Sequence, residues 1–423
     1  MTTSTVQQDT DNLFSWDTII STFDDFGALI AKFTLYDNGT TRDAEFESGV
    51  LRYEVLADTG TAEAPAGVKT WDRIERTYDA GGNLAETYQL NDNGIQILQN
   101  YEAGTLRAKT EVDLGPSGEQ SDAAIWEYRE TYYDENGVIA ERFETRDDGL
   151  RILTQYENGV RRYVEQADLG DNGEPSDARV WERIETFYDE NGVIAERFRV
   201  DDNGLVTITQ YEDGTRRAET KADFDGLGNS TDGKNWDQIE SIYDENGKLT
   251  ERFIEYDDGT NKYTEYDAGV RRAETLTDLD DFGNSTDTKS WERIEKTYDA
   301  NGDISEYFEL RDDGTTFFRE YQNGEQVFSE LLDRDEFGLP TDAKSWDAIR
   351  KFFGEDGELQ AAETVYDNGD AKALFYEDEI LVARYDLDGD NSETWDSREI
   401  LYNLDGTVAE VNFDVLGDVP GFA

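Results

Sequence analysis

Residues 181–192 read Trp-Glu-Arg-Ile-Glu-Thr-Phe-Tyr-Asp-Glu-Asn-Gly, and a stretch of this kind recurs along the chain. Its tryptophan belongs to a series that includes every tryptophan of the sequence: Trp16, Trp71, Trp126, Trp181, Trp236, Trp291, Trp346 and Trp395. The first six intervals in this series are 55 residues and the last is 49. A fixed period of this kind is typical of a repeat protein, in which one small unit is stacked many times.

Glycines divide each repeat into short segments. One series lies eleven residues after each tryptophan, as at Gly192, a second lies twelve residues later, as at Gly204, and a third lies ten further on, as at Gly214. Glu379 interrupts the third series. Asx-Gly pairs between segments rich in Thr, Val, Ile, Tyr and Phe are the strongest short hairpin signal, because glycine supplies the positive φ of a tight turn.

Each repeat is therefore expected to contain four strands joined by three tight turns. For the repeat at Trp181 the sequence predicts strands over 181–188, 193–200, 205–211 and 215–222, followed by a long loop over 223–235. Helix is not expected, because no apolar stripe with a period of 3.6 residues runs between the glycines.

These elements predict an all-β fold of tandem 55-residue, four-stranded antiparallel β-meander repeats that form an open twisted or superhelical β array. Seven full units and two further strands make 30 strands, and a closed ring of four-stranded blades needs a multiple of four. A seven- or eight-bladed β-propeller is the alternative. The expected organisation is a polar N-terminal segment over 1–15, seven repeats over 16–394 starting at 16, 71, 126, 181, 236, 291 and 346, and a C-terminal half-repeat or cap over 395–423.

Charge and composition exclude several functional classes. The chain has 99 acidic and 39 basic residues, a formal net charge of −60, and neither histidine nor cysteine. A Ser-His-Asp triad, a Cys/His metal site and a disulfide are therefore impossible. The charge opposes binding to nucleic acid and to anionic membranes and favours cations. No unique polar cluster is seen to interrupt the repeat, so we expect a protein that is not an enzyme.

Carboxylates recur in the long loop in a pattern that suits calcium, which prefers six to eight oxygen ligands from a flexible loop. Five repeats share an Asp, a Gly five residues on and a second Asp four residues later. The candidate ligands are Asp113, Asp122, Asp168, Asp171, Asp177, Asp223, Asp225, Asp232, Asp278, Asp280, Asp287, Asp333, Asp335, Asp342, Asp386 and Asp388. The alternative is that these side chains only cap turns through Asx hydrogen bonds.

Paired arginines begin the fourth strand of three repeats, at Arg161–Arg162, Arg216–Arg217 and Arg271–Arg272. Glutamates follow closely, and successive strand residues face opposite sides of a sheet. A ladder of ion pairs along the array is one interpretation. A stripe that binds anions or sugar acids is the other.

The segment Tyr243-Asp-Glu-Asn-Gly-Lys-Leu249 resembles the Tyr-Asp-x-x-Gly-x-Leu motif of bacterial YD-repeat (Rhs-like) proteins, and it recurs at Tyr78, Tyr133, Tyr188 and Tyr298. The 55-residue period is longer than the YD repeat. The acidic repeats are also similar to those of RTX-type secreted bacterial proteins, although their Gly-Gly-x-Gly-x-Asp nonapeptide is absent. Both resemblances imply an extracellular β-rich scaffold or shell.

The sequence thus predicts a non-catalytic extracellular structural or adhesive repeat protein, rigidified by calcium and self-assembling head to tail into homo-oligomers or filaments. The alternative is a module that binds a glycan or a protein through its aromatic and arginine rows, with a cell-surface partner. No nucleic acid partner and no membrane insertion are expected. Because the first residues lack a basic and an apolar signal region, the expected location is extracellular or cell-surface by a non-classical, type I-like route, with the cytoplasm as the alternative.

Overall fold

The computed structural model describes residues 2–11, 13–59, 69–114, 124–169, 179–223, 233–278, 289–334, 339, 344–390, 393 and 395–413. The chain divides into two compact units, Met1–Gly214 (unit 1) and Thr215–Ala423 (unit 2). All regular secondary structure in the described residues is β-strand. No helix among them is long and apolar enough to cross a membrane.

Sixteen strands belong to unit 1: β1 Thr3–Gln8, β2 Trp16–Phe23, β3 Leu29–Tyr36, β4 Thr40–Glu47, β5 Val50–Asp58, β6 Trp71–Tyr78, β7 Leu84–Asn91, β8 Ile95–Glu102, β9 Thr105–Asp113, β10 Trp126–Tyr133, β11 Ile139–Arg146, β12 Leu150–Glu157, β13 Val160–Asp168, β14 Trp181–Tyr188, β15 Ile194–Asp201 and β16 Leu205–Glu212. Fifteen belong to the described part of unit 2: β17 Thr215–Asp223, β18 Gln238–Tyr243, β19 Leu249–Glu255, β20 Asn261–Asp267, β21 Val270–Thr277, β22 Trp291–Tyr298, β23 Ile304–Arg311, β24 Thr315–Gln322, β25 Glu325–Asp333, β26 Trp346–Phe353, β27 Leu359–Tyr366, β28 Ala371–Glu377, β29 Ile380–Leu387, β30 Ser397–Tyr402 and β31 Val408–Phe413. The four strands predicted for the repeat at Trp181 match β14 to β17 to within one residue at each end.

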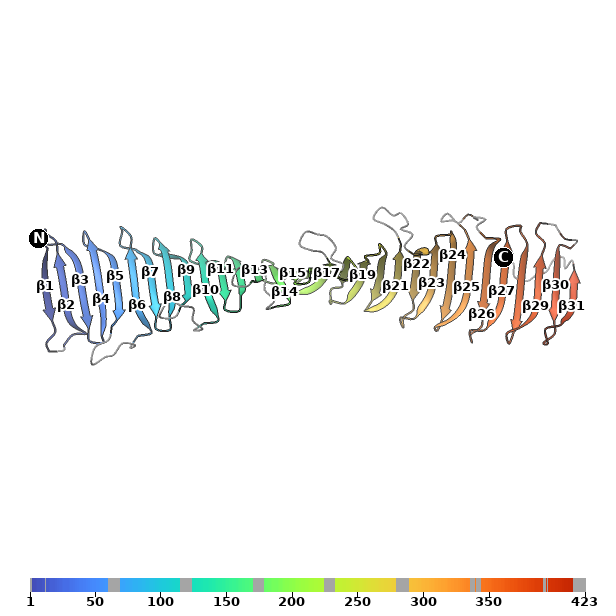
Figure 1. Ribbon diagram of the computed structural model, residues 1–423, viewed down its shortest axis with the longest axis horizontal. Coiled ribbons are helices and arrows are strands. Elements are labelled where there is room, and N and C mark those ends of the chain that lie inside the picture. The colour runs from blue at the N-terminus through green and yellow to red at the C-terminus, as the bar shows by residue number, and fades with distance from the viewer. Residues whose placement is uncertain are drawn as a thin grey trace. The chain divides into compact units, whose positions relative to one another are not determined.

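In each unit every strand pairs with the next one in the sequence, and all these pairs are antiparallel. Among the described strands, the first and last strand of a unit do not pair with each other. Figure 1 shows the strands of unit 1 turning progressively from β1 to β16. The predicted open, twisted antiparallel array is therefore confirmed, and the closed propeller is wrong.

The turns have the backbone geometry that the glycine series predicts. Gly192, Gly204 and Gly214 have φ values of 81°, 84° and 79°. In the third turn of a repeat the residue before the glycine also has positive φ, as Asn158 does at 52°. Two successive residues of positive φ define a type I′ turn, whose twist matches that of the flanking strands. Glu379 occupies a glycine position of this turn with a φ of 63°.

Each unit is a single-layer sheet. Every described strand contacts only the strands next to it in sequence. The described hydrophobic side chains that are buried are few: Ala44, Ile74, Trp126, Leu150, Ile184, Ile239, Ala348, Ala373 and Ala383. Because no described strand forms a second layer over either face, we attribute the stability of the described sheet to the strand ladder and to cross-strand side-chain pairs on its two faces.

Candidate functional site

The predicted calcium ligands fall into two groups. Seven of them are described: Asp113, Asp168, Asp223, Asp278, Asp333, Asp386 and Asp388. The other nine lie outside the described residues: Asp122, Asp171, Asp177, Asp225, Asp232, Asp280, Asp287, Asp335 and Asp342.

Five aspartates, each at the end of a fourth strand or directly after it, close the long loops: Asp113, Asp168, Asp223, Asp278 and Asp333. They are at most 2% exposed, and each Oδ2 accepts a hydrogen bond from the backbone amide eleven residues ahead. At Asp168 this bond comes from Arg179 N at 2.7 Å. Each of these buried carboxylates thus closes its loop through an amide eleven residues on, a longer span than the Asx hydrogen bond of a tight turn. The carboxylates that would share a calcium ion with them lie outside the described residues.

The last acidic loop is arranged differently. Asp386 accepts from Arg384 Nε at 2.8 Å and from Arg398 Nε at 2.6 Å, so it is an ion-pair partner. Asp388 lies beside Asp370 and Asp390, and one carboxylate oxygen from each falls within 4.8 Å of the others. Asp370 was not predicted, because it comes from the preceding hairpin and only the fold brings it to the loop.

The paired arginines join successive repeats. Arg161 lies over the ring of Tyr188, with its guanidinium carbon 5.6 Å from the ring centroid. Arg162 donates through Nη1 to the carbonyl of Asp189 and through Nε to Glu157 at 3.0 Å. The tyrosine and aspartate of the Tyr-Asp motif thus each receive one arginine from the preceding repeat.

This arginine–tyrosine–aspartate contact, here called the joint, recurs along the chain. The arginine-over-tyrosine part is found at Arg216 with Tyr243 (4.1 Å) and at Arg271 with Tyr298 (5.3 Å). The arginine-to-carbonyl part is found at three further sites: Arg52 with Asp79, Arg107 with Asp134 and Arg272 with Asp299. Arg216 and Arg271 also pair with Glu219 and Glu274, at 2.9 and 3.4 Å, so ion pairs of the predicted kind form in two of the three repeats.

A β-bulge aims the second arginine at the next repeat. Tyr156 pairs with Arg161 and Gln155 pairs with Tyr163, which leaves Arg162 as the extra residue. Bulges often redirect a side chain in this way. The aspartate of the motif shapes the turn that Arg162 contacts. Its carboxylate oxygen, Asp189 Oδ1, accepts hydrogen bonds from the amides of Asn191 and Val193 at 2.9 and 2.8 Å. The hydrogen bond from Val193 is the main reason that the pKa of Asp189 lies below its usual value.

The central rows of the two faces of unit 1 carry opposite charge. The next row on the face with the basic central rows is acidic, with Asp58, Asp113, Asp168 and Asp201 against Arg146. Directly paired residues of neighbouring antiparallel strands lie on the same face, so the strand register defines rows. Two rows, from Ile19 to Thr207 and from Ser21 to Thr209, run along what we call the basic face. Their charged residues are eight basic and three acidic: Lys32, Arg42, Glu54, Arg76, Lys109, Glu111, Arg129, Arg142, Glu144, Arg197 and Arg199.

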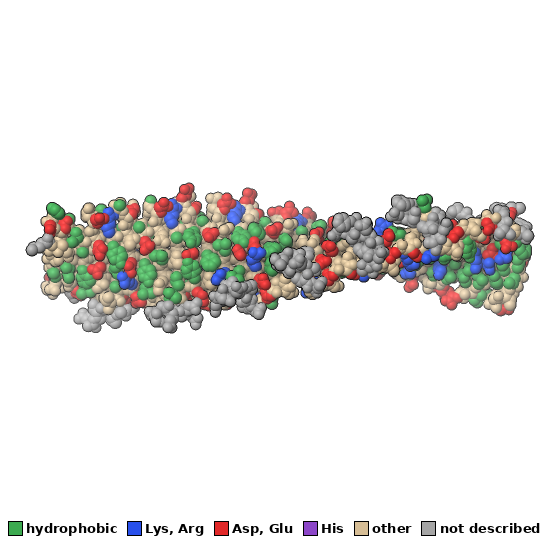
Figure 2. All heavy atoms as spheres, turned by 45° about the horizontal axis from the view of Figure 1, so that its top comes forward, with side chains coloured by type: hydrophobic (Ala, Val, Ile, Leu, Met, Phe, Trp, Pro, Cys, Tyr) green, Lys and Arg blue, Asp and Glu red, His purple; other side chains and the backbone are tan. Residues whose placement is uncertain are grey.

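The opposite, acidic face has two central rows, from Ile20 to Ile208 and from Thr22 to Gln210, whose charged residues are Asp43, Glu45, Glu75, Glu86, Glu130, Glu141, Glu165, Glu185 and Glu196. A third row on this face contains Arg73, Arg151 and Arg183. Figure 2 shows unit 1 from one side, with hydrophobic side chains along the middle of the strands and many acidic ones toward the strand ends. Charge is therefore unevenly distributed between the two faces of unit 1.

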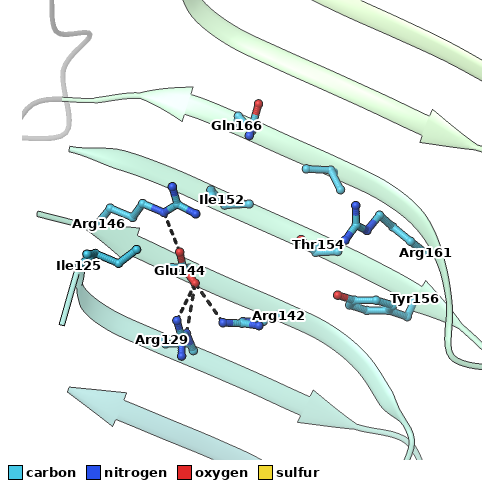
Figure 3. A pocket seen from close by; sticks show the side chains of 11 residues that line it. Ile125, Arg129, Arg142, Glu144, Arg146, Ile152, Thr154, Tyr156, Arg161 and Gln166 are labelled. Atoms are coloured by element: carbon cyan, nitrogen blue, oxygen red, sulfur yellow. Dashed lines mark hydrogen bonds and ion pairs between the residues drawn. The ribbon is translucent and has the colours of Figure 1, made fainter. Parts of the chain in front are cut away.

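The basic face is hollowed at the repeat that begins at Trp126. This arginine hollow has a volume of about 400 Å³ and is lined by Ile125, Arg129, Arg142, Glu144, Arg146, Ile152, Thr154, Tyr156, Arg161, Val164 and Gln166. Four arginines against one glutamate give the lining a formal charge of three positive. Figure 3 shows Arg129, Arg142 and Arg146 directed at Glu144. Arg161 lies on another strand, further along the sheet.

Glu144 organises the arginines. Its side chain is 9% exposed and accepts from Arg129 Nη2 at 3.0 Å, Arg142 Nη2 at 3.1 Å and Arg146 Nε at 2.7 Å. Burial alone would raise the pKa of Glu144, but the hydrogen bonds and charges of Arg146 and Arg129 outweigh it and hold the pKa below its usual range. The glutamate is therefore ionised at neutral pH and fixes three guanidinium groups around one point.

The expectation that no polar cluster interrupts the repeat is wrong at this position. Residues 55 positions before the four central members of the hollow are Ile74, Thr87, Gln89 and Asn91, where the hollow has Arg129, Arg142, Glu144 and Arg146. Comparing repeats position by position would have found the substitution. It would not have shown that the four residues meet, because this depends on the strand register.

No protein-family model matches the chain, and no match is found among curated proteins. Among solved structures, the chain is similar to TcdB2-TccC3 without its hypervariable C-terminal region, at 13% identity and a TM-score of 0.18. That match covers 98% of this chain and 22% of the other. A candidate 6-phosphogluconolactonase from Bacteroides uniformis matches at 10% identity and a TM-score of 0.12, covering 76% of this chain and 94% of that one. Both TM-scores are far below 0.5, so neither similarity indicates a shared global fold or function.

Proposed function

We propose that the protein is a non-catalytic structural or adhesive repeat protein that acts outside the cell. The observation that carries this proposal is the joint. In several repeats, an arginine on the fourth strand of one repeat donates to the first tight turn of the next repeat and fastens the two together. A chain whose repeats use identical, nearest-neighbour contacts is suited to present a regular surface over a large area.

The resemblance to YD-repeat proteins supports the extracellular part of the proposal. Its motif supplies both groups that the joint uses, the tyrosine ring and the aspartate carbonyl. The aspartate side chain is used for the turn itself. The tyrosine and aspartate of the motif therefore hold neighbouring repeats together in this chain, a structural role that suits a scaffold.

We further propose that copies assemble head to tail through β1 and β31. Among the described strands, β1 pairs only with β2 and β31 only with β30. Val6 on β1 is 62% exposed, and Val408 and Phe413 on β31 are each 56% exposed. An edge strand with exposed apolar side chains offers a template for pairing with another chain.

Light scattering after size exclusion, together with negative-stain microscopy, tests this assembly. The expected result is a concentration-dependent mass above that of the monomer, and its loss in the variant Val6→Lys/Val408→Lys, because lysine on an edge strand blocks pairing. Val193→Lys, a substitution at an exposed residue away from both strands, serves as control and should assemble like the wild type. A strict monomer at millimolar concentration would contradict the proposal.

Calcium remains part of the proposal, and the observation that supports it best is the group of Asp370, Asp388 and Asp390. Three carboxylates at this spacing offer oxygen ligands of the kind that calcium takes. Titration with CaCl2 followed by calorimetry should give a binding signal that Asp390→Asn removes. An equal signal from the variant would indicate only general association of cations with an acidic chain.

A further inference from the structure

We propose that the arginine hollow binds a sugar acid, a saccharide that carries a carboxylate. The hollow lies on the basic face of unit 1 and is lined by Arg129, Arg142, Arg146 and Arg161 around the buried Glu144. This site is separate from the edge strands on which the proposed assembly rests, and it shares one residue, Arg161, with a joint.

The first line of evidence is unused donor capacity. Each guanidinium has five N–H groups in a fixed fork that matches a carboxylate. Among the described contacts, Arg142 reaches Glu144 through Nη2 alone and Arg146 through Nε alone. Their side chains are 37% and 36% exposed. Glu144 thus holds the arginines in place without using most of their donors.

The second line of evidence is the remainder of the lining, shown in Figure 3. Tyr156 offers a ring and a hydroxyl, Thr154 a hydroxyl and Gln166 an amide, and Ile152 and Val164 offer apolar surface. Aromatic and aliphatic surface beside a few polar groups suits a sugar ring, whose faces are apolar and whose edges carry hydroxyls. A simple inorganic anion would need only the arginines.

The third line of evidence is the charge of the whole chain. Electrostatic interactions between exposed groups are screened beyond about 8 Å at physiological ionic strength, so a small anion in the hollow responds mainly to the local charge of three positive. A long polyanion would also meet the acidic groups outside the hollow, which give the chain its −60. Nucleic acid carries one charge per about 1.7 Å and is disfavoured for this reason. A short saccharide with separated carboxylates is the better fit.

The repeat provides a variant that should fold. Arg129→Ile/Arg142→Thr/Glu144→Gln/Arg146→Asn gives this repeat the residues that the preceding repeat has at the same positions. The substitution changes the formal charge by two negative units. Arg73→Thr/Arg183→Gln changes it equally on the acidic face, with residues found at the same position in other repeats, Thr18 and Gln238. It serves as the matched control. The single change Arg161→Leu adopts the residue of the preceding repeat, Leu106, at an exposed position. It tests the hollow with one substitution and also removes the contact with the ring of Tyr188.

The experiment is calorimetric titration of the full chain with trigalacturonate at 50 mM NaCl, compared with its methyl ester, hexaglutamate and a ten-residue oligothymidylate. We expect trigalacturonate to bind at least tenfold more tightly than each of the other three. The fourfold variant should weaken binding at least tenfold and Arg161→Leu at least threefold. The charge-matched control should change it by less than twofold.

Four results would overturn the proposal. Equal binding of the methyl ester would show that the carboxylate is not recognised. Equal binding of hexaglutamate or the oligonucleotide would show that the hollow takes anions of another class. An equal loss in the control variant would show that only net charge matters. If the fourfold variant does not fold, unchanged binding by Arg161→Leu overturns the proposal.

Discussion

At the scale of single residues, the turns show how strictly the backbone selects glycine. Gly49 and Gly324, in the third turns of other repeats, have φ values of 81° and 84°, and Glu379 stands at the same position with 63°. A residue with a Cβ in this region costs roughly 1–2 kcal/mol. The interruption of the glycine series at Glu379 is therefore a local weakness of that hairpin.

Glu379→Gly should raise the free energy of unfolding by about 1 kcal/mol, because glycine removes this strain. Urea unfolding monitored by circular dichroism measures it. Gly324→Glu, the reverse change in another repeat, should lower stability by a similar amount. A destabilised Glu379→Gly protein would mean that the glutamate makes a compensating contact.

Two exposed aspartates carry pH-dependent stability. Asp258 and Asp313 accept from Lys289 and Lys344, each at 2.7 Å, and hydrogen bonds from these lysines and from the threonines that follow lower the pKa of both aspartates to about 2. A carboxylate whose pKa is lower in the folded state stabilises fully above its unfolded value of 3.8, and this contribution is lost as pH falls toward about 2.

Lys289→Met and Lys344→Met should therefore return the pKa of the partner aspartate toward 3.8. They should also reduce stability at pH 5 but not at pH 1.5. Carbon-detected NMR titration of the two carboxyl groups measures the first effect and thermal melts the second. A pKa that stays near 2 without the lysine would assign the shift to the threonine contacts alone.

At the scale of elements, the joint connects a bulged strand to the turn of the next repeat. Arg162 uses a position that has no partner in the strand ladder, so its side chain can reach the carbonyl of Asp189. Glu157, its other partner, is 66% exposed, and an exposed ion pair contributes little. The bond to the carbonyl is thus the main contribution of Arg162 to this joint.

Arg162→Gln should lower the free energy of unfolding by about 1 kcal/mol, the typical net value of one hydrogen bond. Hydrogen exchange should also become faster at the amides of Asn191 and Val193, which the turn protects. Glu157→Gln is the control and should leave both quantities nearly unchanged. Equal effects from the two variants would assign the stability to the ion pair instead.

How much of these elements could be predicted depends on the property in question. The strand positions could be predicted, because a tight turn needs glycine or Asx. Strands β14 to β17 lie between such residues. The face on which each side chain lies could not be predicted. Each bulge shifts the alternation of side chains between the two faces by one residue, as between Gln155 and Tyr156. Without the register, the meeting of Arg129 with Glu144, or of Asp370 with Asp388, is not visible in the sequence.

At the scale of the whole molecule, the net charge of −60 sets a balance between repulsion and local pairing. Salt weakens both the repulsion between carboxylates and the attraction within ion pairs. Exposed ion pairs contribute at most about 1 kcal/mol each, whereas 60 acidic groups have no basic residue to balance them. Relief of repulsion should therefore dominate.

The melting temperature at pH 7 should rise as NaCl is increased from 10 mM to 1 M, over which the screening length falls from about 30 to 3 Å. Differential scanning calorimetry measures it. CaCl2 at matched ionic strength should add a further rise only if a specific site is filled. A melting temperature that falls with NaCl would show that attractive pairs outweigh the repulsion.

The restriction of contacts to neighbouring strands has a genetic consequence. If recombination removed or duplicated a whole 55-residue repeat, the new neighbours would meet through the same turn, the same bulge and the same arginine contacts. Copy number could then drift while the fold is kept. The arginine hollow, which belongs to one repeat, could be lost, doubled or moved in a single event.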